Sequence, residues 1–457
     1  MDEIQSIVIV GAGQAGAVAA ASLRQLGYRG GLTLVGQEAH PPYERPPLSK
    51  AVLQGTATHA EAAVHPAGFY AENDIALLTE TAVAALDPAA RTVRLADGRT
   101  LPYDRCLLAT GGHARELPAL PRGRAGVHYI RTLDDALDLR AALRPGVRAA
   151  VIGGGALPRG RAGVHYIRTL DDALDLRAAL RPGVRAAVIG GGFLGLEVAS
   201  TARELGAEVT VIENGSRLLE RALPAIVSDW LAERVRASGV DLRLGGAIAA
   251  IGDGPPYAIT LADGTQVNAD LIVVSIGLAP EVTLARQAGL PLDDNGGICV
   301  DSQARTADPQ VYAAGDCASQ PRACLGTAAR FESWQNANEQ ARAAAAAMLG
   351  LAPAAEPYPW FWTDQYGCNI QILGLPQPGL RYVCRPQTDP QAAPRVLWIG
   401  LRDGVPCHGI AVNAGGDLRQ LRVLFERGIP VDPHRLADPA EALKPLVKAW
   451  QAAVAVA

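Results

Sequence analysis

The segment from Ile7 to Glu38 constrains the fold more than any other part of the chain. The apolar run IVIV predicts a strand, the turn GAGQAG follows it, an Ala-rich helix comes next, and LTLV predicts a second strand. In such a unit the first glycine allows the sharp turn from strand to helix, the second lets the backbone approach a pyrophosphate, and the third lets the helix lie close to the strand. The segment therefore predicts a dinucleotide-binding unit in which Gly11, Gly13 and Gly16 are these glycines.

An acidic residue closes this unit. Glu38 follows Gly11 by 27 positions, where a carboxylate can accept hydrogen bonds from ribose hydroxyls. The chain has 49 glycines, so a GxGxxG pattern alone is weak evidence, and a plain glycine turn is the alternative. The flanking strand, the helix and the closing acid favour the dinucleotide-binding unit. Its pyrophosphate is expected at the helix N-terminus, where unpaired N–H groups and the helix dipole attract an anion.

A second unit of the same kind begins at RAAVIGGG and ends at Glu213. Its glycines are Gly190, Gly192 and Gly195. They open a helix that is expected to end at about Leu205, and the strand AEVTVIE follows. Glu213 is placed to accept a hydrogen bond from the adenosine 2′-hydroxyl, and its charge would repel the 2′-phosphate of NADP. Arg217 could weaken this repulsion, but the acid at the strand end is the stronger signal, so NADH is the expected nucleotide.

Residues 119–155 and 156–192 are identical over 37 positions. Solenoid repeats diverge and recur at least three times, so a single perfect doubling indicates a recent tandem duplication or an assembly error. The first copy ends in Gly153-Gly154-Gly155 and continues into Ala156-Leu157-Pro158, which puts Pro158 where the third glycine is required, so the second copy is expected to supply the nucleotide site. The surplus is expected as an added, poorly packed segment within about 119–184. Because the copies are identical, the helix of the first copy could take the native place of the second.

The Pro-rich stretch HPPYERPPLSK, residues 40–50, predicts a rigid and largely non-helical loop. Flavin disulfide reductases carry a redox-active cysteine pair at this place, and there is none here, so electron transfer through a dithiol is not expected. Only three of the 42 basic residues are Lys. Lys50 therefore has either a specific use for its compact ammonium group or, with equal weight, an accidental place in the loop.

Three later predicted strands are followed, at their carboxyl ends, by glycines or polar residues. Residues 75–111 alternate strands and turns up to Thr110 and Gly111, the strand ADLIVVSIG ends at Gly277, and VYAAGD ends at Gly315 and Asp316. The carboxyl ends of such strands are where ligands bind in α/β proteins. The alternatives are a simple chain crossing for the first turn and a helix cap for the aspartate.

The tryptophans gather late in the chain, where four of the six fall between 334 and 398. Trp360-Phe361-Trp362 precedes the polar run TDQY, which favours an apolar wall beside a polar site over plain core packing. Farther on, Arg419 and Arg422 share one face of a predicted helix, for which a solvated surface is the default interpretation.

Composition excludes several classes of function. The net charge of −4 and the pI near 6.1 provide no basic field for nucleic acid or a membrane surface. The first core strand begins near Ile7 and no apolar run is long enough to cross a bilayer, so a cytoplasmic protein is expected. Seven cysteines without CxxC or metal-ligand spacing predict free thiols, no metal site and no iron–sulfur cluster in this chain.

These motifs together resemble the FAD-dependent ferredoxin reductases that serve bacterial cytochrome P450 and Rieske ring-hydroxylating oxygenase systems, a branch of the glutathione-reductase-like flavoproteins. The resemblance covers nearly the whole length, through VGAGQAG, RPPLSK, ATGG, GGGFLGLE, VYAAGD, ESWQNA, PWFWTDQY and AVNAGGDLR. It implies an α/β fold with two Rossmann-like dinucleotide-binding domains of the three-layer ββα type and an α+β C-terminal domain. The implied domains are FAD-binding, 1–118 and 279–348; NAD-binding, 119–278; and C-terminal reductase, 349–457.

The resemblance also implies roles for single residues. FAD would be held by Gly11, Gly13, Gly16, Glu38, Arg45, Lys50, Val83, Thr110, Gly111, Arg115, Gly315, Asp316 and Trp334, and NADH by Gly190, Gly192, Gly195, Glu213 and Gly277. Lys50 and Glu197 would pair near the nicotinamide as the catalytic residues. The chain departs from the family pattern in its duplication, in His113 where Arg is more usual, and in Gly367-Cys368 after the aromatic motif.

The implied function is an NADH-dependent reductase that passes electrons through FAD, one at a time, to a [2Fe-2S] ferredoxin. A flavin is needed because NADH gives up a hydride while the ferredoxin accepts single electrons. Two alternatives remain open: reduction of rubredoxin, a quinone or another small acceptor, and a weakly catalytic FAD- and NADH-binding protein like apoptosis-inducing factor. A monomer or homodimer is expected, without nucleic-acid or membrane partners.

Overall fold

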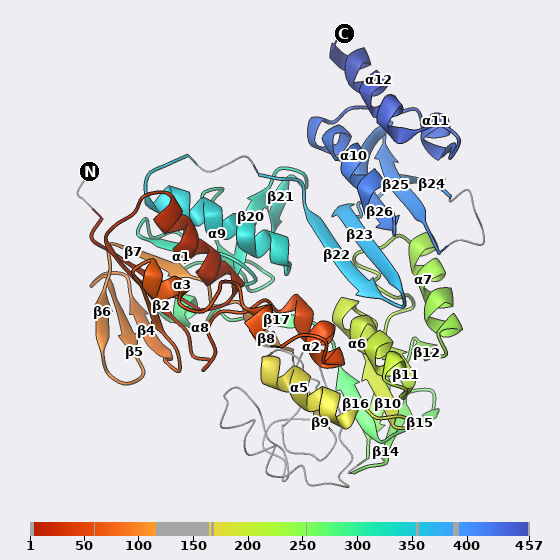
Figure 1. Cartoon of the computed structure of the whole chain (residues 1–457), viewed down its shortest axis with the longest axis horizontal. Helices are drawn as coiled ribbons and strands as arrows, with labels where there is room; N and C mark the ends of the chain where they lie inside the picture. The colour runs from red at the N-terminus through yellow and green to blue at the C-terminus, as the bar shows by residue number, and fades with distance from the viewer. Residues whose placement is uncertain are drawn as a thin grey trace.

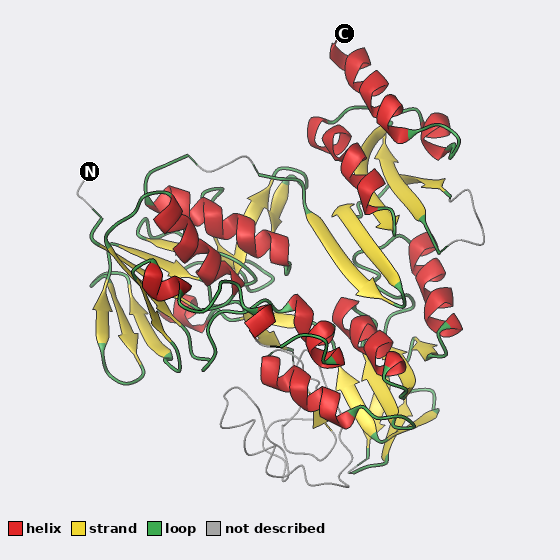
Figure 2. Ribbon diagram, in the orientation of Figure 1, coloured by secondary structure: helices red, strands yellow, loops and turns green. Residues whose placement is uncertain are grey.

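The fold is described from a computed structural model (Figures 1 and 2). The structure describes residues 4–58, 60–115, 164–165, 169–252, 254–352, 356–386 and 393–455. Figure 1 shows a first α/β unit on the left, a second at the lower right, and a C-terminal sheet with its helices at the upper right.

A five-stranded parallel sheet in the order β19-β7-β1-β2-β3 forms the centre of the first unit. Its strands are β1 (Ser6–Val10), β2 (Gly31–Val35), β3 (Ile75–Leu78), β7 (Arg105–Leu108) and β19 (Val311–Ala313). Both faces of this sheet are buried, which is why its strands read as continuous apolar runs. β19 comes from late in the chain and pairs with β7, so residues around 311 belong to the same sheet as the first dinucleotide-binding unit.

The two faces of this sheet are covered by different structures. Ile7 and Ile9 pack under the helices α1 (Gln14–Gln25) and α9 (Trp334–Met348). Val8 and Val10, which alternate with them, pack on an antiparallel sheet. That sheet consists of β4 (Val83–Asp87), β5 (Thr92–Leu95) and β6 (Thr100–Pro102). The result is the predicted ββα sandwich of three layers.

The second unit repeats this plan. Its parallel sheet, in the order β12-β11-β10-β16-β9, consists of β9 (Val164–His165), β10 (Arg185–Ile189), β11 (Glu208–Glu213), β12 (Asp241–Leu244) and β16 (Leu271–Val274). Its helices are α5 (Leu170–Ala179), α6 (Phe193–Glu204) and α7 (Ala225–Ala237). The antiparallel layer is β13 (Ile248–Ile251), β14 (Tyr257–Leu261) and β15 (Gln266–Ala269). Here too the strand side chains alternate, since Val188 packs in the helical layer and Ile189 against β14 and β15.

The C-terminal part is an antiparallel sheet in the order β22-β23-β26-β25-β24, with helices on one side (Figure 2). The strands are β22 (Trp360–Gln365), β23 (Cys368–Gly374), β24 (Arg381–Arg385), β25 (Val396–Arg402) and β26 (Val405–Val412), and the helices are α10 (Gly415–Arg427), α11 (Pro433–Ala437) and α12 (Leu443–Ala455). β22 contacts both α6 and α9, so one strand of this sheet reaches both dinucleotide-binding units.

Short elements connect these parts. They are η1 (Pro46–Ser49), α2 (Ala51–Gln54), η2 (Ala60–Ala62), α3 (Phe69–Glu72), β8 (Gly112–Ala114), β17 (Leu278–Pro280), α8 (Thr283–Gln287), β18 (Ile298–Cys299), β20 (Ala318–Arg322) and β21 (Thr327–Ala329). β8 and β17 pair with each other where the chain passes between the two units.

The predicted fold class is confirmed, and one local prediction needs correction. The loop at 40–50 is less irregular than expected, because its last four residues before Lys50 form the 3-10 helix η1 and α2 follows at once. Pro46 occupies the first position of η1, where the missing N–H costs nothing and the fixed φ favours a helix.

The second copy of the duplicated sequence supplies β9, α5 and β10, as predicted for the copy with the complete glycine turn. The first copy, and the surplus segment expected from it, lie outside the described residues. The domain boundaries at 118, 278 and 348 remain a prediction. Within the part of the chain that the structure describes, no helix is both long and apolar enough to cross a membrane.

Candidate functional site

The first glycine turn joins β1 to α1 and explains each glycine separately. A Cβ on Gly11 would lie 2.2 Å from the carbonyl oxygen of Ala109, and one on Gly16 would lie 2.0 Å from the carbonyl oxygen of Gly11. These two positions therefore exclude any side chain. A Cβ on Gly13 would meet nothing within 4 Å. The backbone at Gly13 thus faces open space beside the first turn of α1, where a phosphate can approach closely.

The second turn, between β10 and α6, repeats this geometry. A Cβ on Gly190 would lie 2.1 Å from the carbonyl oxygen of Ser275, and one on Gly195 would lie 2.1 Å from the carbonyl oxygen of Gly190. At Gly192 the nearest atom would be 3.9 Å away. Two independent turns with blocked outer glycines and an open middle glycine fit two dinucleotides.

Both closing acids are held in place at the ends of their strands. Glu38 accepts hydrogen bonds from the Tyr43 hydroxyl at 2.6 Å and from Nη2 of Arg45 at 2.8 Å. Glu213 accepts from the backbone N–H groups of Gly191 and Gly215, each at 2.6 Å. Donors on both sides fix the Glu213 carboxylate as an acceptor at the edge of the second unit, where an adenosine ribose is expected.

A cavity of about 1930 Å³ connects the two turns. Ordinary small-molecule pockets measure roughly 300–1,000 Å³, so this space is large enough for two dinucleotides that meet. Seventeen of the predicted site residues line it: Gly11, Gly13, Glu38, Arg45, Lys50, Val83, Thr110, Gly111, Arg115, Gly190, Gly192, Glu197, Glu213, Gly277, Gly315, Asp316 and Trp334. Gly16 and Gly195 are not among the lining residues, in accordance with their close packing behind the turns.

Lys50 and Glu197 meet where the two units adjoin. The Lys50 Nζ lies 3.2 Å from Oε1 of Glu197 and 3.3 Å from Oδ2 of Asp364, and it lies 5.8 Å from the centre of the Trp362 ring. Lys50 follows η1 of the first unit, Glu197 is on α6 of the second, and Asp364 is on β22 of the C-terminal sheet. Three parts of the chain therefore converge on one ammonium group.

Glu197 is a buried carboxylate with several donors. Ser49 Oγ donates to its Oε2 at 2.7 Å and Thr363 Oγ1 donates to its Oε1 at 2.6 Å. Burial raises the pKa of Glu197 above its usual value, and the Lys50 charge and the two hydroxyl groups oppose this rise.

Aromatic side chains form one wall of the cavity. Trp360 and Trp362 stack with ring centres 5.1 Å apart, and Trp334 stands edge-on to Trp362 at 5.8 Å. Phe361 points to the other side of β22 and contacts Phe193 at 4.5 Å, at the beginning of α6. The indole N–H of Trp334 donates to Oε1 of Glu44 at 3.1 Å. The predicted apolar wall beside the polar TDQY run is therefore present.

The remaining predicted residues lie along the cavity between the units. Thr110 Oγ1 donates to the carbonyl oxygen of Glu281 at 2.5 Å, and Nε of Arg115 donates to that of Leu278 at 3.0 Å. Nη1 of Arg330 donates to the carbonyl oxygen of Asp316 at 3.0 Å. Gly111, Gly277 and Gly315 all have positive φ, at 65°, 104° and 84°. These glycines allow turns that a residue with a side chain would strain.

Sequence reasoning missed three polar partners in this site. Ser49, Thr363 and Asp364 surround the Lys50–Glu197 pair, yet Ser49 and Glu197 are 148 positions apart in the sequence. The TDQY run was a usable signal for Thr363 and Asp364, and Ser49 lies in the RPPLSK motif, but nothing in the sequence paired Ser49 with Glu197. Among the described residues no group of three or more His, Cys, Asp or Glu could hold a metal ion, and all seven cysteines are free thiols.

Comparisons with known proteins agree with this geometry. The model of the family Pyridine nucleotide-disulphide oxidoreductase matches residues 5–158 and 156–341, and the model Reductase C-terminal matches residues 360–447. The first match is divided at the boundary between the two identical copies.

Two curated relatives are ferredoxin–NAD(+) reductase components of dioxygenase systems. The component of the anthranilate 1,2-dioxygenase system of Burkholderia cepacia is 39% identical over 96% of this chain and 98% of its own length. That of the 3-phenylpropionate/cinnamic acid dioxygenase of Photorhabdus laumondii is 37% identical over 92% of this chain and 96% of its own.

Solved structures lead to the same family. Putidaredoxin reductase in its covalent complex with putidaredoxin is 35% identical, with a TM-score of 0.84 over 98% of this chain and 99% of that one. A ferredoxin reductase from Rhodopseudomonas palustris is 32% identical, with a TM-score of 0.82 over 96% and 98%. With two dinucleotide-binding units, a reductase C-terminal domain and relatives matched over nearly their whole length, the chain belongs to the ferredoxin reductases of the pyridine nucleotide-disulphide oxidoreductase family, flavoproteins that use FAD and NADH.

Proposed function

We propose that this protein oxidises NADH and passes the electrons through bound FAD, one at a time, to a [2Fe-2S] ferredoxin that serves an oxygenase. The observation that carries this proposal is the cavity that joins two glycine turns and has the Lys50–Glu197 pair between them. Bound FAD supplies the conversion between a hydride, which carries two electrons, and an acceptor of single electrons.

The first unit would hold FAD. The open backbone at Gly13 would receive the pyrophosphate, Glu38 the adenosine ribose, and Arg45 would balance the phosphate charge. Val83, Thr110, Gly111 and Arg115 would line the path toward the flavin end, with Gly315 and Asp316 at the ribityl chain and Trp334 at the pyrimidine end of the ring. The blocked position of Gly16 would serve only the packing of α1 on β1.

The second unit would hold NADH. Gly192 would face the pyrophosphate, Glu213 would accept from the 2′-hydroxyl, and Gly277 would let the nicotinamide half pass between the units. Gly190 and Gly195 would shape the turn itself. The half-buried carboxylate of Glu213 would disfavour the 2′-phosphate of NADPH, because two like charges would lie close together in a site partly shielded from water.

Lys50 and Glu197 would act at the junction where the nicotinamide meets the flavin. Lys50 would place its ammonium group at the cavity wall, where Glu197 of the opposite unit and Asp364 of β22 hold it. The aromatic wall of Trp334, Trp360 and Trp362 excludes water from the path of the hydride, which protects it from loss to solvent. The role of the protein is therefore positioning and electrostatics, while the redox chemistry belongs to the bound cofactor.

The identity of the acceptor is inferred from relatives. The curated relatives are named as ferredoxin reductases of dioxygenase systems, and one structural relative was solved with putidaredoxin attached. We infer a [2Fe-2S] ferredoxin as the partner here, a cytoplasmic location that suits seven free thiols, and a monomer or homodimer, which light scattering would decide.

Stopped-flow and steady-state kinetics test the function. Anaerobic NADH should bleach the yellow protein, and a purified [2Fe-2S] ferredoxin should then support many turnovers. Turnover with rubredoxin or a quinone but not with ferredoxin would reassign the acceptor. Slow, stoichiometric reduction with every acceptor would instead indicate a nucleotide-binding protein with little catalytic use.

A further inference from the structure

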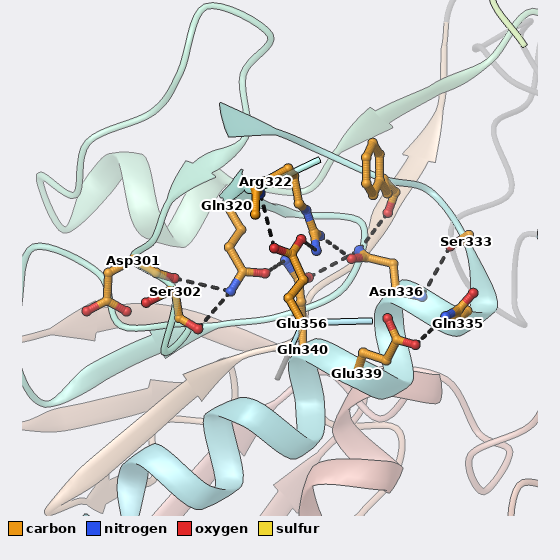
Figure 3. Close-up of polar contacts among 12 residues, drawn as sticks. Asp301, Ser302, Gln320, Arg322, Ser333, Gln335, Asn336, Glu339, Gln340 and Glu356 are labelled. Carbon is orange, nitrogen blue, oxygen red and sulfur yellow. Dashed lines mark hydrogen bonds and ion pairs between the residues drawn. The ribbon is translucent and has the colours of Figure 1, made fainter. Parts of the chain in front are cut away.

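A network of buried polar side chains connects β20 with α9 (Figure 3), and two of its members, Arg322 and Asn336, line the cavity. Gln320 and Arg322 come from β20, and Asn336 and Gln340 from α9, with exposed fractions of 7%, 5%, 3% and 2%. Buried polar groups are costly unless they are paired, so such a cluster persists only where its members satisfy one another. No sequence motif pointed to these residues as a group.

Gln340 fastens the turn that carries Asp316. Its Oε1 accepts the backbone N–H of Gly315 at 2.8 Å and Nδ2 of Asn336 at 3.2 Å. Its Nε2 donates to Oε1 of Gln320 at 3.2 Å, and Nε2 of Gln320 donates in turn to the carbonyl oxygens of Asp301 and Ser302. Gln340 is not among the residues that line the cavity. Gln340 therefore acts on a ligand through its neighbours, Gly315 and Asn336, both of which line the cavity.

Arg322 determines how the amide groups in this hydrogen-bond network are oriented. It forms an ion pair with Glu356 at 3.1 Å, donates to Oδ1 of Asn336, and lies 4.7 Å from the Phe331 ring centre. Because a guanidinium can only donate, Asn336 must turn its oxygen toward Arg322 and its nitrogen away. That nitrogen donates to the carbonyl oxygen of Phe331 at 2.8 Å and to Gln340.

The orientation of Gln340 follows from that of Asn336. Since the Asn336 nitrogen donates to it, Gln340 must present its oxygen on that side, and this same oxygen receives the Gly315 N–H. A flipped Gln340 amide would place an N–H against an N–H and leave Gly315 without an acceptor. The charge of Arg322 therefore reaches the Gly315–Asp316 turn through two amide groups.

We propose that Gln340 and Arg322 are positioning residues for FAD. Gln340 holds the Gly315–Asp316 turn in the conformation in which the Asp316 carboxylate meets the ribityl chain, and Arg322 sets the orientation of Gln340 through Asn336. The inference rests on the proposed role of Asp316 as an FAD ligand and deepens it. Glu356, which precedes β22, accepts a hydrogen bond from Arg322 and so connects this network to the segment that leads into the aromatic wall.

The test measures the dissociation constant of FAD from reconstituted apoprotein. Gln340→Met keeps the length of the side chain but removes the acceptor, and Asn336→Asp keeps the acceptor for Arg322 but removes the donor to Gln340. Arg322→Met removes the charge. We expect each variant to raise the FAD dissociation constant by about tenfold, the effect of one buried hydrogen bond that is lost.

The decisive measurement repeats these substitutions in protein that already carries Asp316→Ala. If the network acts through Asp316, Gln340→Met and Asn336→Asp should cause little further loss of FAD affinity in that background, whereas independent structural damage would add fully. Gln310→Met is the matched control, because Gln310 precedes the opposite end of β19 and bonds to Arg105, away from the cavity. It should keep the wild-type FAD affinity.

Two results would overturn the inference: wild-type FAD affinity in both the Gln340 and the Asn336 variants, or an equal loss with and without Asp316. Should Arg322→Met fail to fold, Asn336→Asp still decides the matter, because it retains the size, the burial and the contact with Arg322. The outcome is separate from the proposed acceptor, since FAD affinity is measured without NADH or ferredoxin. If the wild-type protein binds FAD but reduces no ferredoxin, only the proposed acceptor is refuted, and the proposal for Gln340 and Arg322 stands.

Discussion

Replacing Lys50 by Met removes the cation that faces the buried Glu197 carboxylate. At the observed 3.2 Å and an effective dielectric constant of 20, the attraction between the two charges is about 5 kcal/mol. The loss of folding stability must be smaller, because Glu197 can take up a proton once Lys50 is gone and because Ser49 and Thr363 still donate to it. Removal of one partner of a buried pair commonly costs about 3–5 kcal/mol, which is the upper limit expected here.

The loss should depend on pH, and the sign follows from the pKa of Glu197. Burial already raises this pKa, and removal of Lys50 removes its main opposing influence. A carboxyl group with a raised pKa in the folded state binds its proton more tightly there than in the unfolded chain. Its stabilising contribution is therefore complete below the unfolded pKa and is lost as the pH rises through the folded pKa. We expect the stability loss of Lys50→Met to be small at pH 5 and larger at pH 8.5, with about 3–5 kcal/mol as its upper limit.

Urea denaturation of Lys50→Met and wild type at several pH values measures this effect. Lys448→Met, an exposed Lys on α12, is the matched control and should show no such trend. FAD binding should be largely intact, while stopped-flow reduction by NADH should be slower than in wild type. A stability difference that is the same at pH 5 and pH 8.5 would refute the assignment of Lys50 as the partner of Glu197, and reduction at the wild-type rate would make Lys50 a mere structural charge.

Four further predictions concern the rest of the chain. NADPH should have a kcat/KM at least about tenfold lower than NADH, given about 1–3 kcal/mol for the clash with Glu213; equal values would contradict this role. Asp316→Ala should weaken FAD binding by roughly 1.5–3 kcal/mol, the value of a hydrogen bond to a charged group, measurable by FAD titration of apoprotein. Charge reversal of Arg419 and Arg422 on α10 should raise the ferredoxin KM in a salt-dependent way; an unchanged KM would exclude this surface. Deletion of residues 119–155 should raise the melting temperature and leave NADH affinity nearly unchanged, since a long excursion contributes mainly loop entropy; loss of NADH reduction would refute that account.

The sequence by itself determined the two dinucleotide-binding units. A glycine turn between an apolar strand and a helix is a local pattern, because Gly16 and Gly195 are blocked by the carbonyl oxygens of Gly11 and Gly190 in the same turns. The requirement at Gly11 and Gly190 comes instead from Ala109 and Ser275, at the ends of neighbouring strands. The same locality decided which copy of the duplicated segment is used, because Pro158 stands where a third glycine must pack. The end of α6 near Leu205 was also predictable from such short-range signals.

Only the tertiary structure decided which polar groups meet. Lys50, Glu197 and Asp364 come from three separate parts of the chain, and Gly315 finds its acceptor on Gln340 of the next helix. Such contacts cannot be predicted from the periodicity of the sequence. The contacts of Lys50 depend on how whole units pack against one another, and the contact of Gln340 depends on the orientation that the donor-only group of Arg322 imposes on its neighbours. The sequence thus predicts where nucleotides can bind, while burial and hydrogen-bond satisfaction in the folded chain decide how their surroundings are held.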